Sequence, residues 1–105
     1  MWNEPSKERL DRIPRLYGTE TTRLAYKIIH LHFFIGGCDW YVAEYDGEDL
    51  FFGFVNLNDE QNSEWGYFSL DELKAISVRG LEIDCELEEF WEPKPALAIP
   101  GIKQR

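Results

Sequence analysis

The sequence predicts an α+β fold, in which about five strands form an antiparallel or mixed sheet flanked by two short helices. The chain has 105 residues, of which 15% are aromatic. Its β-branched and aromatic side chains recur in short runs bounded by turn residues, which is typical of strands. A chain of this length buries roughly two-thirds of the surface that it exposes when unfolded, enough for one core. We therefore expect one α+β domain over residues 1–105, with a helical extension at 1–12 and a Pro-rich tail at 93–105.

Four strands are expected in the first two-thirds of the chain. The run 24–34 (LAYKIIHLHFF) carries mainly apolar side chains on both faces, as an inner strand of a sheet does. Turns that contain glycine separate it from strands at 40–45 and 50–55. A further strand at 65–68 follows a loop that is too polar to be buried.

Capping residues mark the two helices. Ser6 is placed to cap a helix that ends near Arg12, just before a proline. Ser69 and Glu72 form a capping box, which predicts a second helix from there to a C-terminal cap at Gly80.

The segment 81–88 alternates apolar and acidic residues, which predicts a strand with one face in the core and one in water. The inward residues are Leu81, Ile83, Cys85 and Leu87. A row of carboxylates then lines the wet face and continues just beyond it, at Glu82, Asp84, Glu86, Glu88 and Glu89. These charges either protect an exposed sheet edge or imitate a row of phosphates toward a basic protein.

The charge of the chain is unevenly distributed. Asp and Glu number 20 against 11 Lys and Arg, for a net charge of −9. Of the basic residues, only Lys74 and Arg79 lie between positions 28 and 92. Such a field repels the phosphate backbone, so we expect a protein partner with a basic surface and no direct binding of duplex DNA.

The sequence also favours a cytoplasmic protein. No apolar run is long enough to span a membrane or to form a signal peptide, so no membrane association is expected. Cys38 and Cys85 show neither a metal-binding nor a disulfide pattern, which indicates reduced thiols. No motif for a cofactor or a metal is present.

Two histidines provide the one catalytic alternative. His30 and His32 are two positions apart on an expected strand, so their side chains would point the same way, roughly 7 Å apart. Such a pair could supply the general acid and base of a weak or toxin-like ribonuclease. Alternatively, both are ordinary residues at the surface of a sheet, and we favour a non-enzymatic protein.

Gly53 interrupts an aromatic strand, and such a gap is commonly filled by another backbone or by a large side chain. Trp40 or Trp65 could fill it. In a functional interpretation, a tryptophan is instead exposed as an aromatic platform rimmed by carboxylates, with Trp40 and Glu44 as candidate residues.

Several blocks of the chain are similar to a bacterial family called domain of unknown function 2958. They are Ile13–Glu20 (IPRLYGTE), Trp40-Tyr41 with Glu44, Asp49–Val55 (DLFFGFV) and Gly66–Leu70 (GYFSL), within a resemblance that spans about residues 13–95. The resemblance implies a small protein often encoded on plasmids, integrative elements and phages, with no established activity and no catalytic residue to carry over.

These observations lead to one hypothesis for function. We expect an acidic, non-enzymatic binding module, linked to mobile genetic elements, that docks onto a basic protein that handles nucleic acid. The candidate binding residues are Trp40, Glu44, Glu82, Asp84, Glu86, Glu88 and Glu89.

Overall fold

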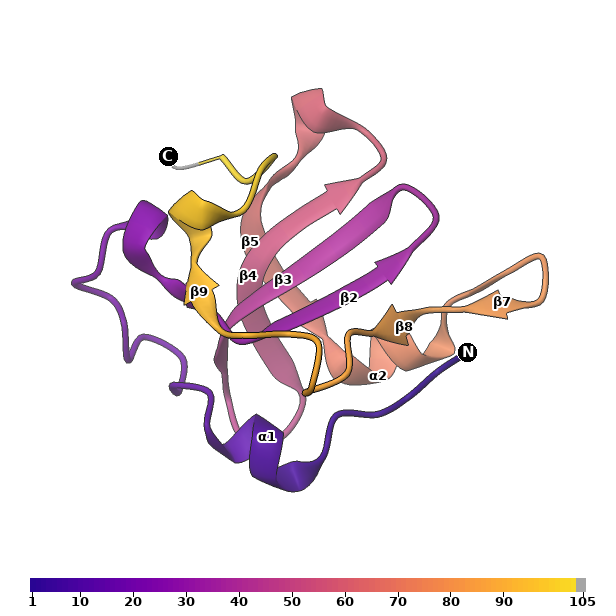
Figure 1. Ribbon diagram of the computed structural model, residues 1–105, viewed down its shortest axis with the longest axis horizontal. Helices are drawn as coiled ribbons and strands as arrows, with labels where there is room; N and C mark the ends of the chain where they lie inside the picture. Colours follow the sequence, from indigo (N-terminus) through magenta and orange to yellow (C-terminus); the bar gives the residue numbers. More distant parts are fainter. Residues whose placement is uncertain (104–105) are drawn as a thin grey trace.

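Five antiparallel strands form the central sheet of the computed structural model, which describes residues 1–103 (Figure 1). Their order across the sheet is β5-β4-β3-β2-β8. The bounds are β2 Leu31–Ile35, β3 Cys38–Tyr45, β4 Leu50–Leu57, β5 Glu64–Ser69 and β8 Asp84–Cys85. The α+β prediction is confirmed, and the sheet is antiparallel rather than mixed.

Two α-helices accompany the sheet, and the residues expected to cap them do so. Ser6 Oγ accepts a hydrogen bond of 3.2 Å from the N–H of Arg9 at the start of α1, Lys7–Asp11. Ser69 Oγ does the same for the N–H of Glu72 in α2, Leu70–Ala75. The helix α2 ends earlier than predicted, because the chain becomes extended at Ile76 and then forms a small hairpin.

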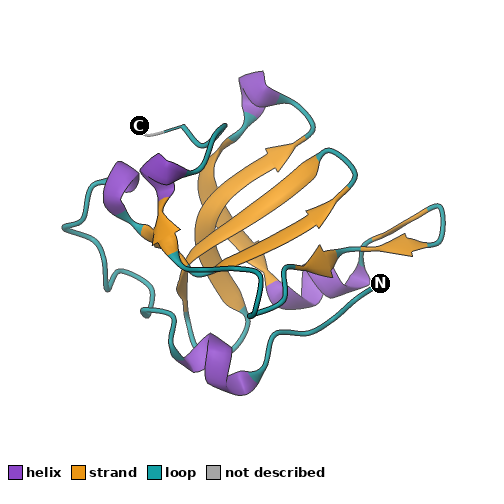
Figure 2. Ribbon diagram, in the orientation of Figure 1, coloured by secondary structure: helices purple, strands orange, loops and turns teal. Residues whose placement is uncertain are grey.

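Short elements complete the fold (Figure 2). The hairpin after α2 pairs β6 with β7, and β1 pairs with β9, which lies near the C-terminus. The bounds are β1 Ile28–Ile29, β6 Ser77–Val78, β7 Leu81–Glu82 and β9 Lys94–Pro95. Three 3-10 turns are η1 Leu24–Tyr26, η2 Glu60–Asn62 and η3 Ala96–Ala98. No helix among residues 1–103 is long and apolar enough to cross a membrane.

The two faces of the central sheet are covered by different parts of the chain. We call one the helix face, where α1 and α2 pack on a core that includes Leu31, Phe33, Val42 and Phe51. We call the other the tail face, where Ala43 and Phe54 pack against Ile29, Ala96, Ile99 and Ile102. Buried aliphatic and aromatic side chains thus lie on both sides of the central strands, as the apolar runs predicted.

Two predicted strands are interrupted in the structure. The run 24–34 begins as a 3-10 turn and breaks at His30, whose N–H donates to the carbonyl of Val42 at 2.8 Å, next to a bulge in β3. The run 81–88 divides into β7 and β8, which belong to different sheets. Leu81 and Leu87, predicted to face the core, are 64% and 46% exposed, because neither lies in the strand that joins the central sheet.

Gly53 is required by the bulge between Val42 and Glu44 in the neighbouring strand β3. A Cβ atom at this position would lie only 1.7 Å from the carbonyl oxygen of Tyr41. The backbone of β3 therefore fills the gap, and the prediction that Trp40 or Trp65 fills it is wrong.

Candidate binding site at the edge of the sheet

The outer edge of β5 is the open edge of the central sheet. Leu50 lies opposite Ser69, and the N–H of Leu70 donates to the carbonyl of Asp49 at 2.9 Å. In an antiparallel pair the hydrogen-bonded and non-bonded positions alternate. The N–H and C=O groups of Trp65 and Tyr67 therefore point away from β4, and no partner for them exists within residues 1–103.

The opposite edge of the sheet, at β8, is closed. The side-chain amide of Asn3 donates to the carbonyl of Cys85 at 2.8 Å. The side-chain carbonyl of Asn3 accepts from the N–H of Cys85 at 2.9 Å. One side chain thus makes both hydrogen bonds that a further strand would make at this position, so β8 offers little to an incoming chain.

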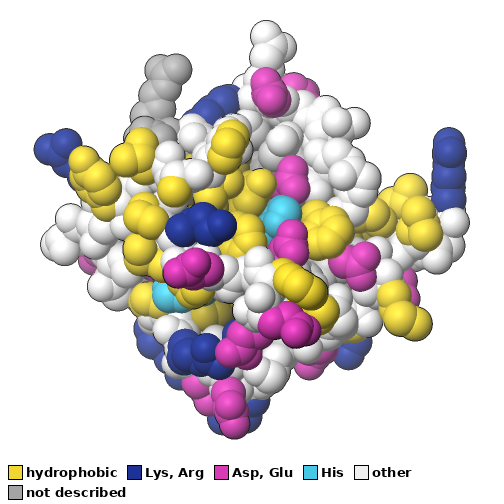
Figure 3. Space-filling model, in the orientation of Figure 1, with side chains coloured by type: hydrophobic (Ala, Val, Ile, Leu, Met, Phe, Trp, Pro, Cys, Tyr) yellow, Lys and Arg dark blue, Asp and Glu magenta, His cyan; other side chains and the backbone are white. Residues whose placement is uncertain are grey.

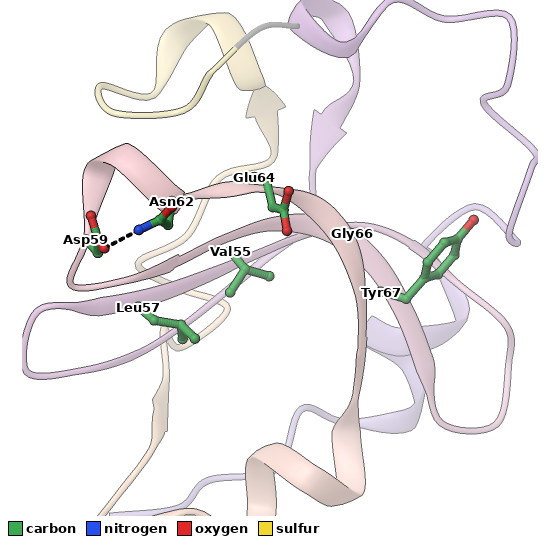
Figure 4. A pocket seen from close by; sticks show the side chains of 7 residues that line it. All are labelled: Val55, Leu57, Asp59, Asn62, Glu64, Gly66 and Tyr67. Atoms are coloured by element: carbon green, nitrogen blue, oxygen red, sulfur yellow. Dashed lines mark hydrogen bonds between the residues drawn. The ribbon is translucent and has the colours of Figure 1, made fainter.

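A hollow of about 490 Å³ opens beside β5 on the helix face, beyond the part that α2 covers (Figure 4). The side chains that β4 contributes to its lining are apolar, and Asp59 and Glu64 contribute carboxylates. The lining residues are Val55, Leu57, Asp59, Asn62, Glu64, Gly66 and Tyr67. A Cβ atom at Gly66 would meet no heavy atom within 4 Å, so the floor at this glycine is open.

Two carboxylates at this hollow form no ion pair within residues 1–103, although the charge of Lys103 acts on Asp59 from farther away. No Lys, Arg or His nitrogen in the described part of the chain lies within ion-pair distance of Asp59 or Glu64. Hydrogen bonds from the side chain of Asn62, at 2.6 Å, and from the N–H of Gln61 hold the pKa of Asp59 below its ordinary value. This end of the sheet therefore presents negative charge next to apolar side chains.

A second hollow, of about 220 Å³, lies beside β5 on the tail face. Aromatic side chains form much of its lining, with a buried ion pair below. The lining residues are Tyr17, Glu20, Lys27, Glu44, Phe52 and Tyr67. Tyr67, which is 52% exposed, borders this hollow and the one on the helix face. The two hollows thus flank the same stretch of the β5 edge.

The buried pair of Lys27 and Glu44 supports the second hollow. Lys27 Nζ lies 3.4 Å from Glu44 Oε2 and donates to the carbonyl of Thr19 at 2.5 Å. Glu44 accepts hydrogen bonds from the N–H of Tyr17, at 2.9 Å, and from both the N–H and the hydroxyl of Thr19. The pair thereby fixes the segment that carries Tyr17 and Glu20 onto the sheet.

Burial of Glu44 by itself raises the pKa of this carboxyl group. The hydrogen bonds from Thr19 and Tyr17, together with the charge of Lys27, outweigh burial, so the pKa lies below its ordinary value. Glu44 is therefore ionised at neutral pH, and its charge serves the internal pair rather than an external ligand. At the hollow's rim, hydrogen bonding with the Tyr17 side chain raises the pKa of Tyr67.

The carboxylate row predicted from the sequence is largely engaged within the molecule. Glu88 pairs with Arg12 at 2.9 Å, and Glu86 lies 3.6 Å from His32 Nδ1. Asp84 lies 2.9 Å from the amino group of Met1, and Glu82 accepts a hydrogen bond from the N–H of Trp2. Glu89 alone among the row has no such contact within residues 1–103.

Trp40 lies in the core of the helix face and is 6% exposed. The hypothesis of an exposed Trp40 platform is therefore wrong: on its strand, Trp40 points in the same direction as the buried side chain of Val42. The tryptophan that borders the open edge is Trp65, whose ring N–H donates to the carbonyl of Lys103 at 2.5 Å.

The structure does not place His30 and His32 in one site. His30 lines a small hollow with Arg9 and Arg12, whereas His32 lines another with Tyr41. In Figure 3 the two cyan patches lie apart, with other side chains between them. The break in the strand at His30 separates the two side chains.

The ring of His32 is held on both sides. Its Nε2 lies 2.7 Å from Asp39 Oδ1, and its Nδ1 is buried and faces Glu86. The ring also stacks on Tyr41, with centroids 4.5 Å apart. A general base must reach its substrate with one nitrogen, and both nitrogens of His32 face carboxylates of this chain. Among residues 1–103, no three His, Cys, Asp or Glu side chains gather to hold a metal ion.

The sequence does not predict the residues of the open edge as a site. The polarity around Asp59 and Glu64 predicts only a surface loop, and the pattern around Tyr67 predicts only a strand. The signal for this edge was the glycine at position 66 between two aromatic residues, with no Lys or Pro to protect the strand.

Comparison with known proteins identifies the family but no activity. The model of the DUF2958 family, described as a protein of unknown function, matches residues 9–98. No curated protein and no solved structure matches the chain. The matched region contains all five strands of the central sheet and both hollows beside β5. The resemblance seen in the sequence blocks is confirmed, and the chain belongs to the DUF2958 family of proteins of unknown function.

Proposed function

We propose that this protein is a non-enzymatic module that binds a basic protein, and that the partner sits at the β5 end of the sheet. One observation carries the proposal. Asp59 and Glu64 border a hollow of about 490 Å³, and neither forms an ion pair within residues 1–103. A surface of this kind gains most from a partner that supplies the missing positive charge.

The lining of the hollow suits a long basic side chain. The aliphatic stem of Lys or Arg can pack on Val55 and Leu57, while its charged head reaches the carboxylates of Asp59 and Glu64. The net charge of −9 adds a long-range attraction that speeds the encounter with a basic partner and disfavours nucleic acid.

The setting of this activity is part of the proposal. A cytoplasmic location and a link to mobile genetic elements follow from the sequence and its family resemblance. A protein that handles nucleic acid carries the basic surface that the module requires, and binding there would modulate that protein.

The test begins with a displayed library of random twelve-residue peptides selected on the full chain. We expect the selected peptides to be enriched in Lys and Arg, and their affinity to fall as the salt concentration rises. Enrichment of acidic peptides, or no enrichment at all, would contradict the proposal.

A matched pair of variants then locates the surface. In the first, Asp59→Asn and Glu64→Gln remove two charges at the hollow, and the best selected peptide should bind about fivefold to tenfold more weakly. In the second, Glu82→Gln and Glu89→Gln remove two charges from the carboxylate row, and affinity should change less than twofold. The reverse result would move the binding surface to the β8 side of the sheet.

A further inference from the structure

We infer that the partner binds as an added strand along the outer edge of β5, with its alternate side chains entering the two hollows beside that edge. This inference rests on the proposed function and specifies how the basic partner is held. The occupant is an extended basic segment of another protein.

The backbone of β5 provides the first argument. Trp65 and Tyr67 direct their N–H and C=O groups outward, two residues apart, which is the spacing at which an antiparallel strand forms its next pair of hydrogen bonds. Strand addition takes its affinity from such main-chain bonds and its specificity from pockets for alternate side chains. Both requirements are met at this edge.

The positions of the hollows provide the second argument. On β5, Phe68 packs toward the helix face and Trp65 toward the tail face, so successive residues alternate between the two. A strand added next to β5 follows the same alternation. Tyr67 borders the hollow on each face, so neighbouring side chains of the added strand reach opposite hollows.

The two hollows differ in the side chains that they favour. On the helix face, Asp59 and Glu64 call for Lys or Arg. On the tail face, the charges of Lys27 and Glu44 compensate each other 3.4 Å apart, and Glu20 adds a carboxylate that forms no ion pair within residues 1–103. Aromatic rings supply much of the surface of that smaller hollow, of about 220 Å³, so it favours a side chain with an apolar body and a polar or basic end. The partner should therefore place Lys or Arg in the helix-face hollow and a long amphipathic side chain in the tail-face hollow.

A second copy of this chain fits the edge less well than a basic segment. Pairing of two β5 edges would bring together two molecules that each carry a net charge of −9. It would also leave the carboxylates of Asp59 and Glu64 without cations, since β5 itself contains no Lys or Arg. Charge complementarity thus selects a different protein.

The experiment uses the best basic peptide from the selection, synthesised in two N-methylated forms. One form carries methyl groups on the odd-numbered amides and the other on the even-numbered amides, so composition and charge are identical. In an added antiparallel strand only every second amide N–H points toward β5, so only one of these two sets donates hydrogen bonds to it. We expect one form to bind about tenfold more weakly or worse and the other to keep its affinity, because each lost main-chain bond weakens binding.

Hydrogen exchange then identifies the edge that is used. With saturating unmodified peptide, the amides of Trp65 and Tyr67 should exchange at least tenfold more slowly, while the amide of Cys85 on the opposite edge should not change. A Gly66→Val variant, which places a side chain in the helix-face hollow, should lose most affinity while its thermal unfolding shows that it still folds. Gly66→Ala serves as its milder control.

The outcomes separate this inference from the proposed function. The peptide could bind through Asp59 and Glu64 while both N-methylated forms bind alike and the amides of Trp65 and Tyr67 stay unprotected. In that case strand addition is wrong, but the proposal of a module that binds a basic protein is retained. If protection appears without peptide as the protein concentration rises, together with a dimer in sedimentation, the occupant is a second copy. If no basic peptide binds, the proposed function itself is wrong.

Discussion

The two edges of the central sheet differ in whether their outward main-chain groups have hydrogen-bond partners. At β8 the strand is two residues long, and the side chain of Asn3 makes both hydrogen bonds available at Cys85. At β5 the strand is six residues long, and the main-chain groups of Trp65 and Tyr67 have no partner within residues 1–103. Natural proteins commonly shorten, charge or cover exposed edges because open ones recruit other chains. The contrast within one molecule therefore points to β5 as an edge kept open for binding.

The charges differ between the same two regions. Beside β8, carboxylates pair with groups of the N-terminal segment, as Glu88 does with Arg12. Beside β5, Asp59 and Glu64 form no ion pair within residues 1–103, and Lys103 acts on Asp59 only from beyond ion-pair distance. A high density of acidic residues in the sequence thus says little about where negative charge is available. What matters is which carboxylates the fold leaves without cations.

Removing the buried carboxylate next to the β5 edge should have the largest effect on stability. Glu44→Ala leaves Lys27 buried without a counter-charge, which should lower the free energy of unfolding by about 3 to 5 kcal/mol. Urea denaturation measures this loss. Hydrogen exchange should show that the amides of Tyr17 and Thr19 lose protection, whereas the amide of Cys85 keeps it. In the control, the double variant Lys27→Met and Glu44→Leu removes the stranded charge but also the acceptor for Tyr17 and Thr19, so only part of the loss should be recovered. A double variant less stable than Glu44→Ala would argue against the role of the charge.

Lowering the pH should weaken the contacts between Glu44 and the segment that contains Tyr17 and Thr19. Because the folded-state pKa of Glu44 lies below the ordinary value of 4.5, its ionised form contributes stability that is fully present above pH 4.5. That contribution is lost as the pH falls through the folded-state pKa. The difference in unfolding free energy between the wild type and Glu44→Gln should therefore be constant at neutral pH and shrink below pH 4.5. A difference that grows in acid would contradict this assignment.

Gly53 on β4 and Gly66 on β5 lie opposite each other, and substitutions at the two positions compare the interior of the sheet with its open edge. Gly53→Ala places a Cβ atom against the carbonyl of Tyr41, so it should destabilise the protein by about 3 kcal/mol or more. Gly66→Ala meets open space and should be neutral or stabilise by up to about 1 kcal/mol. Thermal unfolding of both variants provides the comparison. Equal losses would mean that the edge is not free at Gly66.

The strands and caps were predictable where local chemistry decides. Ser6 and Ser69 cap helices because their hydroxyls satisfy backbone N–H groups within the same segment. The alternation at 81–88 led to a wrong prediction, because it shows which side chains are apolar but not with which strand the segment pairs. Leu81 lies in a small separate hairpin and is exposed. The pairing of β8 with β2 and its contact with Asn3, 82 positions away, are likewise absent from the local pattern.

The candidate site was less predictable than the fold for a related reason. Glu44 could be singled out from the sequence, but its partner Lys27 is brought to it only by the fold. The open edge of β5 depends on the order of strands, which the local pattern around Gly66 does not determine by itself. Trp40 and Trp65 are alike in sequence, yet one lies in the core and the other beside the edge. The difference comes from the strand order, because Trp40 lies on the inner strand β3 and Trp65 on the edge strand β5.

Opening the closed edge should have a moderate effect. Asn3→Ala leaves the N–H and C=O of Cys85 without partners, which should cost about 1 to 2 kcal/mol. The amide of Cys85 should exchange faster, and its protection measures the change. Asn3→Asp keeps the acceptor for the N–H but places a carboxylate oxygen against the carbonyl of Cys85, so it should cost at least as much as Asn3→Ala. If Asn3→Ala were silent in both measurements, the two edges would not differ as described.

The smallest effect on stability is expected where the largest effect on binding is proposed. Asp59→Asn with Glu64→Gln removes two carboxylates that form no ion pair within residues 1–103, so the midpoint of urea unfolding should hardly move. A slight decrease is the expected sign, because hydrogen bonds from Asn62 and Gln61 hold the pKa of Asp59 below its ordinary value, so its ionised form stabilises the fold. Urea denaturation at low and at high salt checks both the size and the sign. A decrease as large as that of Asn3→Ala would show that these carboxylates stabilise the fold, and their placement at the open edge would then have a structural rather than a binding explanation.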